Sequence, residues 1–293
     1  MSFTSMLRNN HWIIKLGFLI IGILLFFYLD FEKIFYYGPF GIHYMRQTDS
    51  LSFASNYFNH GFQFFKPQLY NLKNIDGHAA CEFPITYYLT ALTYTIFGKQ
   101  FYLQRIIHLL IAYFGVYGLY KLAKNIIQDY WYALIISLTL FTSTVFNYYA
   151  FNYLPDIPAL GFAFLGWGFL FHHQSNKKLN ALRISFLFFT LSSLIKITYL
   201  INPIAILVYT FIQFIIKPKN SLFSNHRKII FFSLITLIVV LIWNAYMFYY
   251  ISTYNSNSFN TNALPIWILN KEKIRIVWDH LSEYWYNKYF TRS

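Results

Sequence analysis

The sequence predicts an all-α protein that crosses a membrane about seven times, with shorter extracytoplasmic helices lying against the bilayer surface. Three observations lead to this fold class. Hydrophobic residues make up 57% of the chain and charged residues only 11%, a balance far from that of a soluble domain. Apolar runs near the length that crosses a hydrocarbon core recur along the chain. Lysine and arginine gather between alternate runs, as they do on the cytoplasmic side of membrane proteins.

The composition also excludes several classes of protein. The net charge of +13 could suggest a nucleic-acid partner, but the basic residues form short clusters between apolar runs and no continuous basic face. We therefore expect the chain to have a lipid bilayer as its partner, and no nucleic acid. The single cysteine, Cys81, excludes a disulfide framework and any cysteine-based metal site within the chain.

The predicted spans follow from the length of the apolar runs and the placement of lysine and arginine. They are Trp12–Leu29, Phe101–Ala123, Trp131–Tyr149, Ile157–His172, Ile184–Ile195, Ile201–Ile216 and Ile229–Ile251. The first run is expected to remain as an anchor, because the residues after it offer no small-residue cleavage site. With the N-terminus inside, most of the basic loops lie in the cytoplasm. This orientation predicts a multi-pass protein of the cytoplasmic (inner) membrane.

The longest polar interruption lies outside the membrane in this topology. We expect residues 30–100 to form an extracytoplasmic catalytic loop within a membrane domain of residues 1–251. The loop is predicted to contain a short helix over Asp49–His60 that stops at Gly61. A second helix is predicted over Pro84–Phe97, closed by Gly98. As a helix this run reaches only about 21 Å, so it is expected to lie in the outer interface.

The remaining segment, residues 252–293, is predicted to be an extracytoplasmic interfacial tail. It opens with a polar loop, STYNSNSFNTN, and continues with apolar residues at helical spacing. The apolar residues of this amphipathic segment are Ile274, Val277, Trp278, Leu281, Trp285 and Tyr289. Their pattern, with Trp267 nearby, favours the bilayer interface.

Two acids carry the functional hypothesis. Asp49 in the first loop and Asp156 in NYLPDIPAL lie on the same outer face, where two carboxylates can divide the activation of an acceptor and the binding of a metal or acceptor group. Either acid could instead cap a helix. Arg46 precedes Asp49, and Glu82 could be a first-turn acid of the helix that opens at Pro84.

Two basic residues lie near the outer ends of spans, where charge is costly and often marks a ligand or a pathway. They are Arg105 on the second span and Lys196 between the fifth and sixth. Each could instead snorkel to the interface.

Three stretches carry a family resemblance. They are RQTDSLSFASNYFNHGFQFFKPQL, CEFPITYYLTALTYTIFG and the arginine of FYLQRIIHLL. Together they resemble the first extracytoplasmic loop of the GT-C membrane glycosyltransferases, in particular the protein O-mannosyltransferase-like branch that includes lipid A aminoarabinose transferases. YLPDIPALGFAF resembles that branch's second acidic loop, and LSSLIKITYLINP its helix break with a lysine. The resemblance runs in order from about Trp12 to Pro203.

The resemblance implies an activity and a set of roles. It implies inverting transfer of a sugar from a polyprenyl-phosphate donor to a glycan, lipid or protein acceptor at the outer face of the cytoplasmic membrane. Asp49 takes the place of the loop-one catalytic acid and Asp156 that of the second acid. Arg46, Glu82, Arg105 and Lys196 are then expected to bind substrate, with Arg105 and Lys196 at the donor phosphate. The resemblance implies no certain cofactor, and it leaves open whether the enzyme uses a divalent metal.

Two further readings stay open at this point. Members of that branch usually continue through more spans than the seven predicted before Ser293, so the chain could be a short member, a truncated product or half of an assembly. The alternative function is a polytopic transporter or a non-catalytic membrane subunit, whose outer charges would line a pathway or a docking face. A transporter should show pseudo-symmetric halves with charges near the midplane, and the sequence shows neither.

Overall fold

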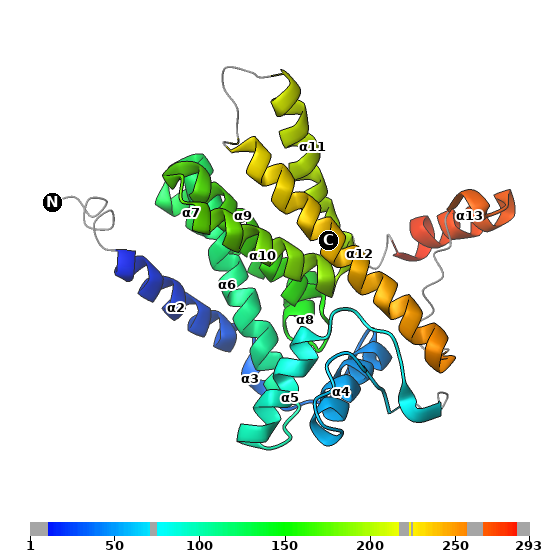
Figure 1. Cartoon of the computed structure of the whole chain (residues 1–293). Coiled ribbons are helices and arrows are strands. Elements are labelled where there is room, and N and C mark those ends of the chain that lie inside the picture. Colours follow the sequence, from blue (N-terminus) through cyan, green and yellow to red (C-terminus); the bar gives the residue numbers. More distant parts are fainter. Residues whose placement is uncertain (1–10, 71–74, 217–222, 224, 257–265, 286–293) are drawn as a thin grey trace. The chain divides into compact units, whose positions relative to one another are not determined.

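The structure, a computed structural model, describes residues 11–70, 75–216, 223, 225–256 and 266–285 (Figure 1). Within these ranges the chain is built from helices, and the β-pairing consists of one isolated antiparallel bridge between Gln68 and His78. The predicted all-α class is confirmed.

Eight of the described helices correspond to the seven predicted spans. They are α2 (His11–Tyr28), α6 (Tyr102–Ile127), α7 (Tyr130–Leu138), α8 (Thr144–Ala150), α9 (Asp156–Asn176), α10 (Leu179–Ile195), α11 (Ile201–Ile216) and α12 (His226–Tyr254). Each predicted span coincides with one of these helices, except that the third corresponds to α7, the 3₁₀ turn η2 (Thr139–Thr142) and α8. The two parts of that span meet at a bend of 77°.

Seven spans were predicted, but fewer of the described helices are long and apolar enough to cross a membrane by themselves. In the described part of the chain three meet this criterion: α6, the continuous 3₁₀ and α-helix Ile197–Ile216, and α12. The bent pair of α7 and α8 makes a fourth if it is one span. By length, α10 falls short, because its 17 residues span only about 26 Å. Crossing by the shorter helices therefore remains a prediction.

The predicted loop of residues 30–100 contains the helices α3 (Phe31–Ile34), α4 (Tyr44–Asn59) and α5 (Ile85–Phe97). The predicted bounds of α5 are confirmed, because Pro84 and Gly98 flank it. The predicted start of the preceding helix at Asp49 is wrong, since α4 begins at Tyr44. That start carries no capping side chain and follows a left-handed His43, so the polar residues Thr48 and Asp49 gave a false signal.

A stripe of glycines lets α6 and α9 approach backbone to backbone. A Cβ atom placed on Gly115 would lie 2.4 Å from the Cα of Gly161, and one on Gly118 would lie 2.8 Å from the carbonyl oxygen of Phe164. Small residues at such contacts are typical of helix pairs in bilayers, where van der Waals packing replaces the hydrophobic drive. The contact fixes α9, and with it Asp156 at its first turn.

The other side of α9 is joined to α10 by side-chain hydrogen bonds. Ser192 donates to the carbonyl of Ala159 at 2.6 Å, and Ser185 donates to the carbonyl of Gly166 at 2.7 Å. Both serines are fully buried. The register between the first turn of α9 and the last turn of α10 is thereby set by polar contacts.

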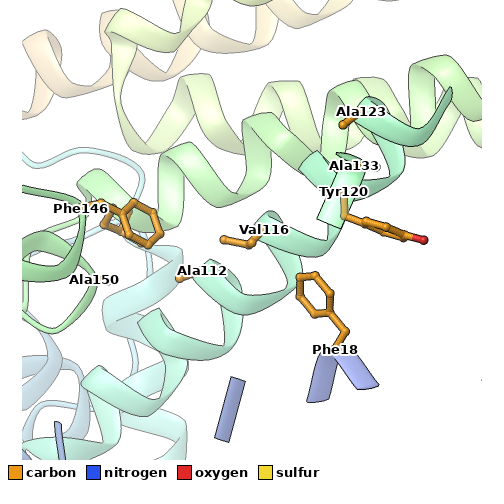
Figure 2. Packing of buried hydrophobic residues seen from close by; sticks show 9 residues of the cluster. Phe18, Ala112, Val116, Tyr120, Ala123, Ala133, Phe146 and Ala150 are labelled. Carbon is orange, nitrogen blue, oxygen red and sulfur yellow. The ribbon is translucent and has the colours of Figure 1, made fainter. Parts of the chain in front are cut away.

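The N-terminal helix α2 meets α6 through an aromatic contact. Phe18 is buried, and Figure 2 shows its ring beside α6, near Val116 and Tyr120. Its ring also lies edge-on to Tyr113 and Tyr117, with centroids 5.5 and 5.4 Å apart. Aromatic packing is thus what joins the predicted anchor helix to α6.

The C-terminal part, Phe259–Ser293, forms a separate compact unit. Its helices are η4 (Ile266–Ile268), α13 (Lys271–Asp279) and the π-helical η5 (His280–Trp285). The predicted amphipathic helix is present, and Trp278 and Leu281 are exposed on it. The predicted polar loop begins later than expected, because α12 continues to Tyr254. Tyr289 lies outside the described residues.

We predict that Gly161→Ala lowers stability by about 1–3 kcal/mol, the usual effect of overpacking a tight core. The added Cβ would lie 2.7 Å from the backbone oxygen of Ile111, so the two helices must move apart. The measurement is the melting temperature of the protein purified in detergent. Gly17→Ala is the matched control, because nothing lies within 4 Å of its Cβ position. Equal melting temperatures for the two variants would contradict the glycine contact.

Candidate active site

The first charged pair joins α4 to the segment before α5. Arg46 donates from Nη2 to one carboxylate oxygen of Glu82, and the hydroxyl of Tyr87 donates to the other. Ser50 lies behind them, with its Oγ 3.3 Å from the Tyr87 hydroxyl. Glu82 precedes Pro84 and so stands outside α5. The alternative of a first-turn helix acid is therefore wrong, and Glu82 instead orients a cation and a buried phenol.

Electrostatics keeps Arg46 charged and Tyr87 neutral. Burial alone would lower the pKa of Arg46, but the charge of Glu82, its hydrogen bond to Arg46 and the neighbouring Tyr87 and Cys81 together raise the pKa. Burial raises the pKa of Tyr87 well above its usual value, and the negative charge of Glu82 raises it further. Arg46 thus keeps its positive charge, and Tyr87 stays a buried neutral phenol whose hydrogen bond goes to Glu82.

Asp49 lies one turn after Arg46 on the same face of α4. Half-burial raises the pKa of its carboxyl; the charge of Glu82 raises it further and that of Arg46 opposes the shift. A raised pKa suits a carboxylate that must accept a proton. Because α4 begins at Tyr44, Asp49 stands in its second turn, and the helix-capping alternative is wrong for this residue.

The second charged pair joins α9 to the break after α10. The ammonium of Lys196 donates to Oδ1 of Asp156. Lys196 has an extended backbone between α10 and the 3₁₀ helix η3 (Ile197–Leu200), which is the predicted helix break. Pro155 holds the N-cap position of α9, so Asp156 is a first-turn residue and not the cap. Lys196 contacts this acid instead of extending alone into the headgroups.

A single backbone hydrogen bond connects the two pairs. The amide of Phe83, next to Glu82, donates to the carbonyl of Leu194 at 3.1 Å. The ring of Phe83 also packs edge-on against Trp243 of α12, with centroids 5.0 Å apart. The loop that carries Glu82 is therefore attached to the same helix break that carries Lys196, and four of the predicted site residues belong to one connected structure.

A divalent metal at the site stays a prediction. Among the described residues, no three side chains of histidine, cysteine, aspartate or glutamate gather to hold a metal ion. Glu82 and Asp156 each contact a cationic side chain instead.

Comparison with known proteins places the site in a family. Residues 78–243, more than half of the chain, match the family described as dolichyl-phosphate-mannose-protein mannosyltransferase. The chain belongs to this family. The predicted resemblance to GT-C glycosyltransferases is confirmed, and the chain is a multi-pass membrane protein of the glycosyltransferase class. No curated protein and no solved structure matches it.

The mannosyltransferase match covers only part of the site. It includes Glu82, Asp156 and Lys196, and it begins after Arg46 and Asp49. The contact between Arg46 and Glu82 therefore ties the helix that bears Asp49 to the matched segment.

Arg105 has a different environment from the one expected. It is fully buried, and it donates from Nη1 to the carbonyls of Ile34 at 2.7 Å and Phe35 at 2.8 Å. Nη2 lies 3.3 Å from the carbonyl of Gly38, and the Tyr153 ring lies 4.4 Å from the guanidinium carbon. Full burial rules out snorkelling. These contacts favour a structural role for Arg105, and its predicted contact with phosphate stays a prediction.

Sequence reasoning missed Gln47 and Tyr87. Gln47 is fully buried and donates to the carbonyls of Phe40 at 2.8 Å and Ile42 at 3.3 Å, which ties the first turn of α4 to the preceding segment. The hydroxyl of Tyr148 donates to the same Ile42 carbonyl. No local pattern marks Gln47, and Tyr87 is one of several aromatic residues in its helix. The polar partner five positions earlier, Glu82, was the only available signal for Tyr87.

We predict that Arg105→Lys lowers stability and leaves the apparent KM for the lipid donor unchanged. Lysine has one nitrogen where the guanidinium has two at its end, so it cannot keep the contacts of Nη1 with Ile34 and Phe35 together with that of Nη2 with Gly38, and a loss of about 1–3 kcal/mol is expected. Melting temperature and donor titration are the two measurements. Arg183→Lys is the control, because Arg183 is exposed and contacts only the side chain of Asn180 in the described hydrogen-bond pattern. A raised KM at unchanged stability would instead support the phosphate role.

Proposed function

We propose that this chain transfers a sugar from a polyprenyl-phosphate donor to an acceptor hydroxyl at the outer face of the cytoplasmic membrane, with inversion. The observation that carries the proposal is the pair of acid–cation contacts, Arg46 with Glu82 and Lys196 with Asp156, joined through Phe83 and Leu194. They lie at helix ends of a chain from a mannosyltransferase family. Such a site suits a donor whose phosphate lies at headgroup depth.

In the proposed reaction the acceptor oxygen attacks the anomeric carbon from the side opposite the phosphate. The bond from that carbon to the phosphate oxygen breaks, and its electron pair leaves with the lipid phosphate. The hydroxyl proton passes to Asp49. One displacement inverts the anomeric configuration, through an oxocarbenium-like state by analogy with glycoside hydrolysis.

The remaining residues support this step. Lys196 and Arg46 are partly exposed, with 39% and 29% of their side chains accessible, so both can meet a phosphate. Positive groups fixed where negative charge develops stabilise the departing phosphate. Glu82 with Tyr87 holds Arg46, and Asp156, the second acid of the resemblance, holds Lys196.

The location follows from the donor and from the charge distribution. Nucleotide sugars stay in the cytoplasm, so transfer on the outer side needs a sugar delivered on lipid. The positive-inside rule puts the loop bearing Asp49 and the turn bearing Asp156 on that outer side.

We predict that Asp49→Asn reduces transfer by a factor of about 100 to 10,000, because an amide cannot take the acceptor's proton. Stability should not fall, since Asp49 is not a helix cap and its carboxyl is half-buried. The assay uses the purified chain with a panel of polyprenyl-phosphate sugars and follows the release of lipid phosphate.

Asp76→Asn is the matched control, an exposed acid of the same loop, and it should transfer normally. As the pH is lowered, the wild-type rate should begin to fall while the pH is still above 3.8, the ordinary pKa of aspartate, because burial raises the pKa of Asp49 and the base is protonated earlier. Near-normal turnover of Asp49→Asn would remove Asp49 as the base.

We predict that a cysteine at position 76 reacts with a membrane-impermeant thiol reagent on intact cells, whereas one at position 178 reacts only after permeabilisation. Both positions are exposed, and the charge bias puts them on opposite sides of the membrane. The background is Cys81→Ala, which removes the single native cysteine. Labelling of position 178 from outside would overturn the orientation.

A further inference from the structure

A polar pocket of about 330 Å³ lies at the end of α4 and in the loop that follows it. Its lining residues all end in a polar group, and they are Asn56, Tyr57, His60, Gln63, Lys66 and Gln68. Binding sites for small molecules are usually lined mostly by apolar side chains. A pocket of this size with amide, hydroxyl, imidazole and ammonium groups suits a ligand rich in hydroxyl groups.

The pocket is held in shape by the loop's own hydrogen bonds. The hydroxyl of Tyr57 donates to the carbonyl of Phe64 at 2.9 Å, and the amide of Phe62 donates to the carbonyl of Tyr57 at 2.9 Å. Tyr57 and Asn56 are buried at the base, with 3% and 6% of their surfaces exposed. The loop therefore presents a formed pocket before any ligand arrives.

A tight backbone contact closes the far end of this loop. The amide of Leu69 donates to the carbonyl of Gly77 at 2.7 Å, and a Cβ on Gly77 would lie 2.2 Å from the carbonyl oxygen of Leu69. Gly77 has a φ of 69°, in the left-handed region that favours glycine. This contact holds the strand-like segment that carries Gln68.

The pocket is aligned with the proposed base. Asn56 follows Asp49 by about two helical turns, so the two side chains project from the same face of α4 about 10 Å apart. A ligand held at Asn56 can therefore extend along the helix toward Asp49. Such a reach favours an oligosaccharide or a glycolipid headgroup over a single sugar ring.

The charge of the pocket further limits the class of ligand that it would bind. Lys66 supplies a positive charge, and the described lining contains no acid to neutralise it. An ammonium beside amide groups favours hydroxyls together with a carboxylate or a phosphate.

We propose that this pocket binds the acceptor and that the acceptor is a glycan carrying an anionic group. The inference rests on the proposed function, because it takes Asp49 as the base. A peptide acceptor, which the family description would suggest, is the outcome that the experiment must exclude.

The experiment measures binding to the purified full chain in nanodiscs without donor, by saturation-transfer NMR titration. The sugar probes are single rings because they test only the contacts of the pocket itself, and not the reach toward Asp49. They are glucuronic acid for the carboxylate, N-acetylglucosamine 1-phosphate for the phosphate and neutral methyl glucoside, and a neutral peptide containing serine and threonine is tested beside them. We expect at least one anionic sugar to bind about tenfold more tightly than methyl glucoside, and Lys66→Gln to remove that preference. The anionic probe that binds more tightly shows whether the anionic group of the acceptor is a carboxylate or a phosphate.

Lys99→Gln is the matched control, an exposed lysine on another part of the extracytoplasmic region, and it should leave binding unchanged. Lys66 and Gln63 are exposed, so Lys66→Gln and Gln63→Ala should keep the melting temperature of the wild type. Equal binding of neutral and anionic sugars, preferential binding of the peptide, or binding unaffected by both pocket variants would overturn the proposal.

A parallel assay separates this inference from the proposed function. It follows the release of lipid phosphate from a polyprenyl-phosphate sugar. If release depends on Asp49 but no anionic sugar binds, the pocket assignment fails and the glycosyltransferase proposal stands. If anionic sugars bind through Lys66 but release does not depend on Asp49, the proposed base fails and the binding site stands.

Discussion

The close contact between α6 and α9 is the constraint on which the rest of the membrane region depends. Lipid gives little hydrophobic drive for helices to associate, so their contact relies on backbones that approach closely. Gly115 and Gly161 permit this approach. The helix so fixed begins at Asp156, and its partner α6 carries Arg105, which holds the segment before α4 through its carbonyls. Both acid-bearing segments are therefore placed by one helix pair.

The three acids of the candidate site have different environments, because two of them contact a cationic side chain and the third has no such contact among those described. Glu82 and Asp156 each accept a hydrogen bond from a cation, so their negative charge is compensated locally. Asp49 is half-buried without such a direct pair among its described contacts, and burial raises the pKa of its carboxyl. The paired acids orient cations, and this difference in environment is why we propose Asp49 as the acid that takes the proton.

The sequence predicted those features that depend on neighbours along the chain. Pro84 and Gly98 mark the ends of α5 because they act through local backbone geometry. The start of α4 could not be predicted, because it depends on Gln47 donating to carbonyls of the preceding segment and carries no capping residue. The contact of Arg46 with Glu82 likewise arises from tertiary packing. The list of charged residues was thus predictable, but their pairing was not.

The membrane helices also hold the loop that lines the polar pocket. Tyr246 and Tyr250 of α12 donate to the carbonyls of Phe65 and Pro67, at 2.6 and 3.0 Å, within the loop that lines the pocket. The ring of His78 contacts the Tyr250 hydroxyl at 2.6 Å. α4 reaches the same framework by a different route, through Glu82 and the helix break. Because both attachments lead to packed helices, the loop side of the pocket is held against α4, the helix that carries both Asn56 and Asp49. Positioning of this kind contributes to catalysis where reacting groups are held in place before they meet, so in the proposed transfer the rigidity of this loop serves the reaction as well as the fold.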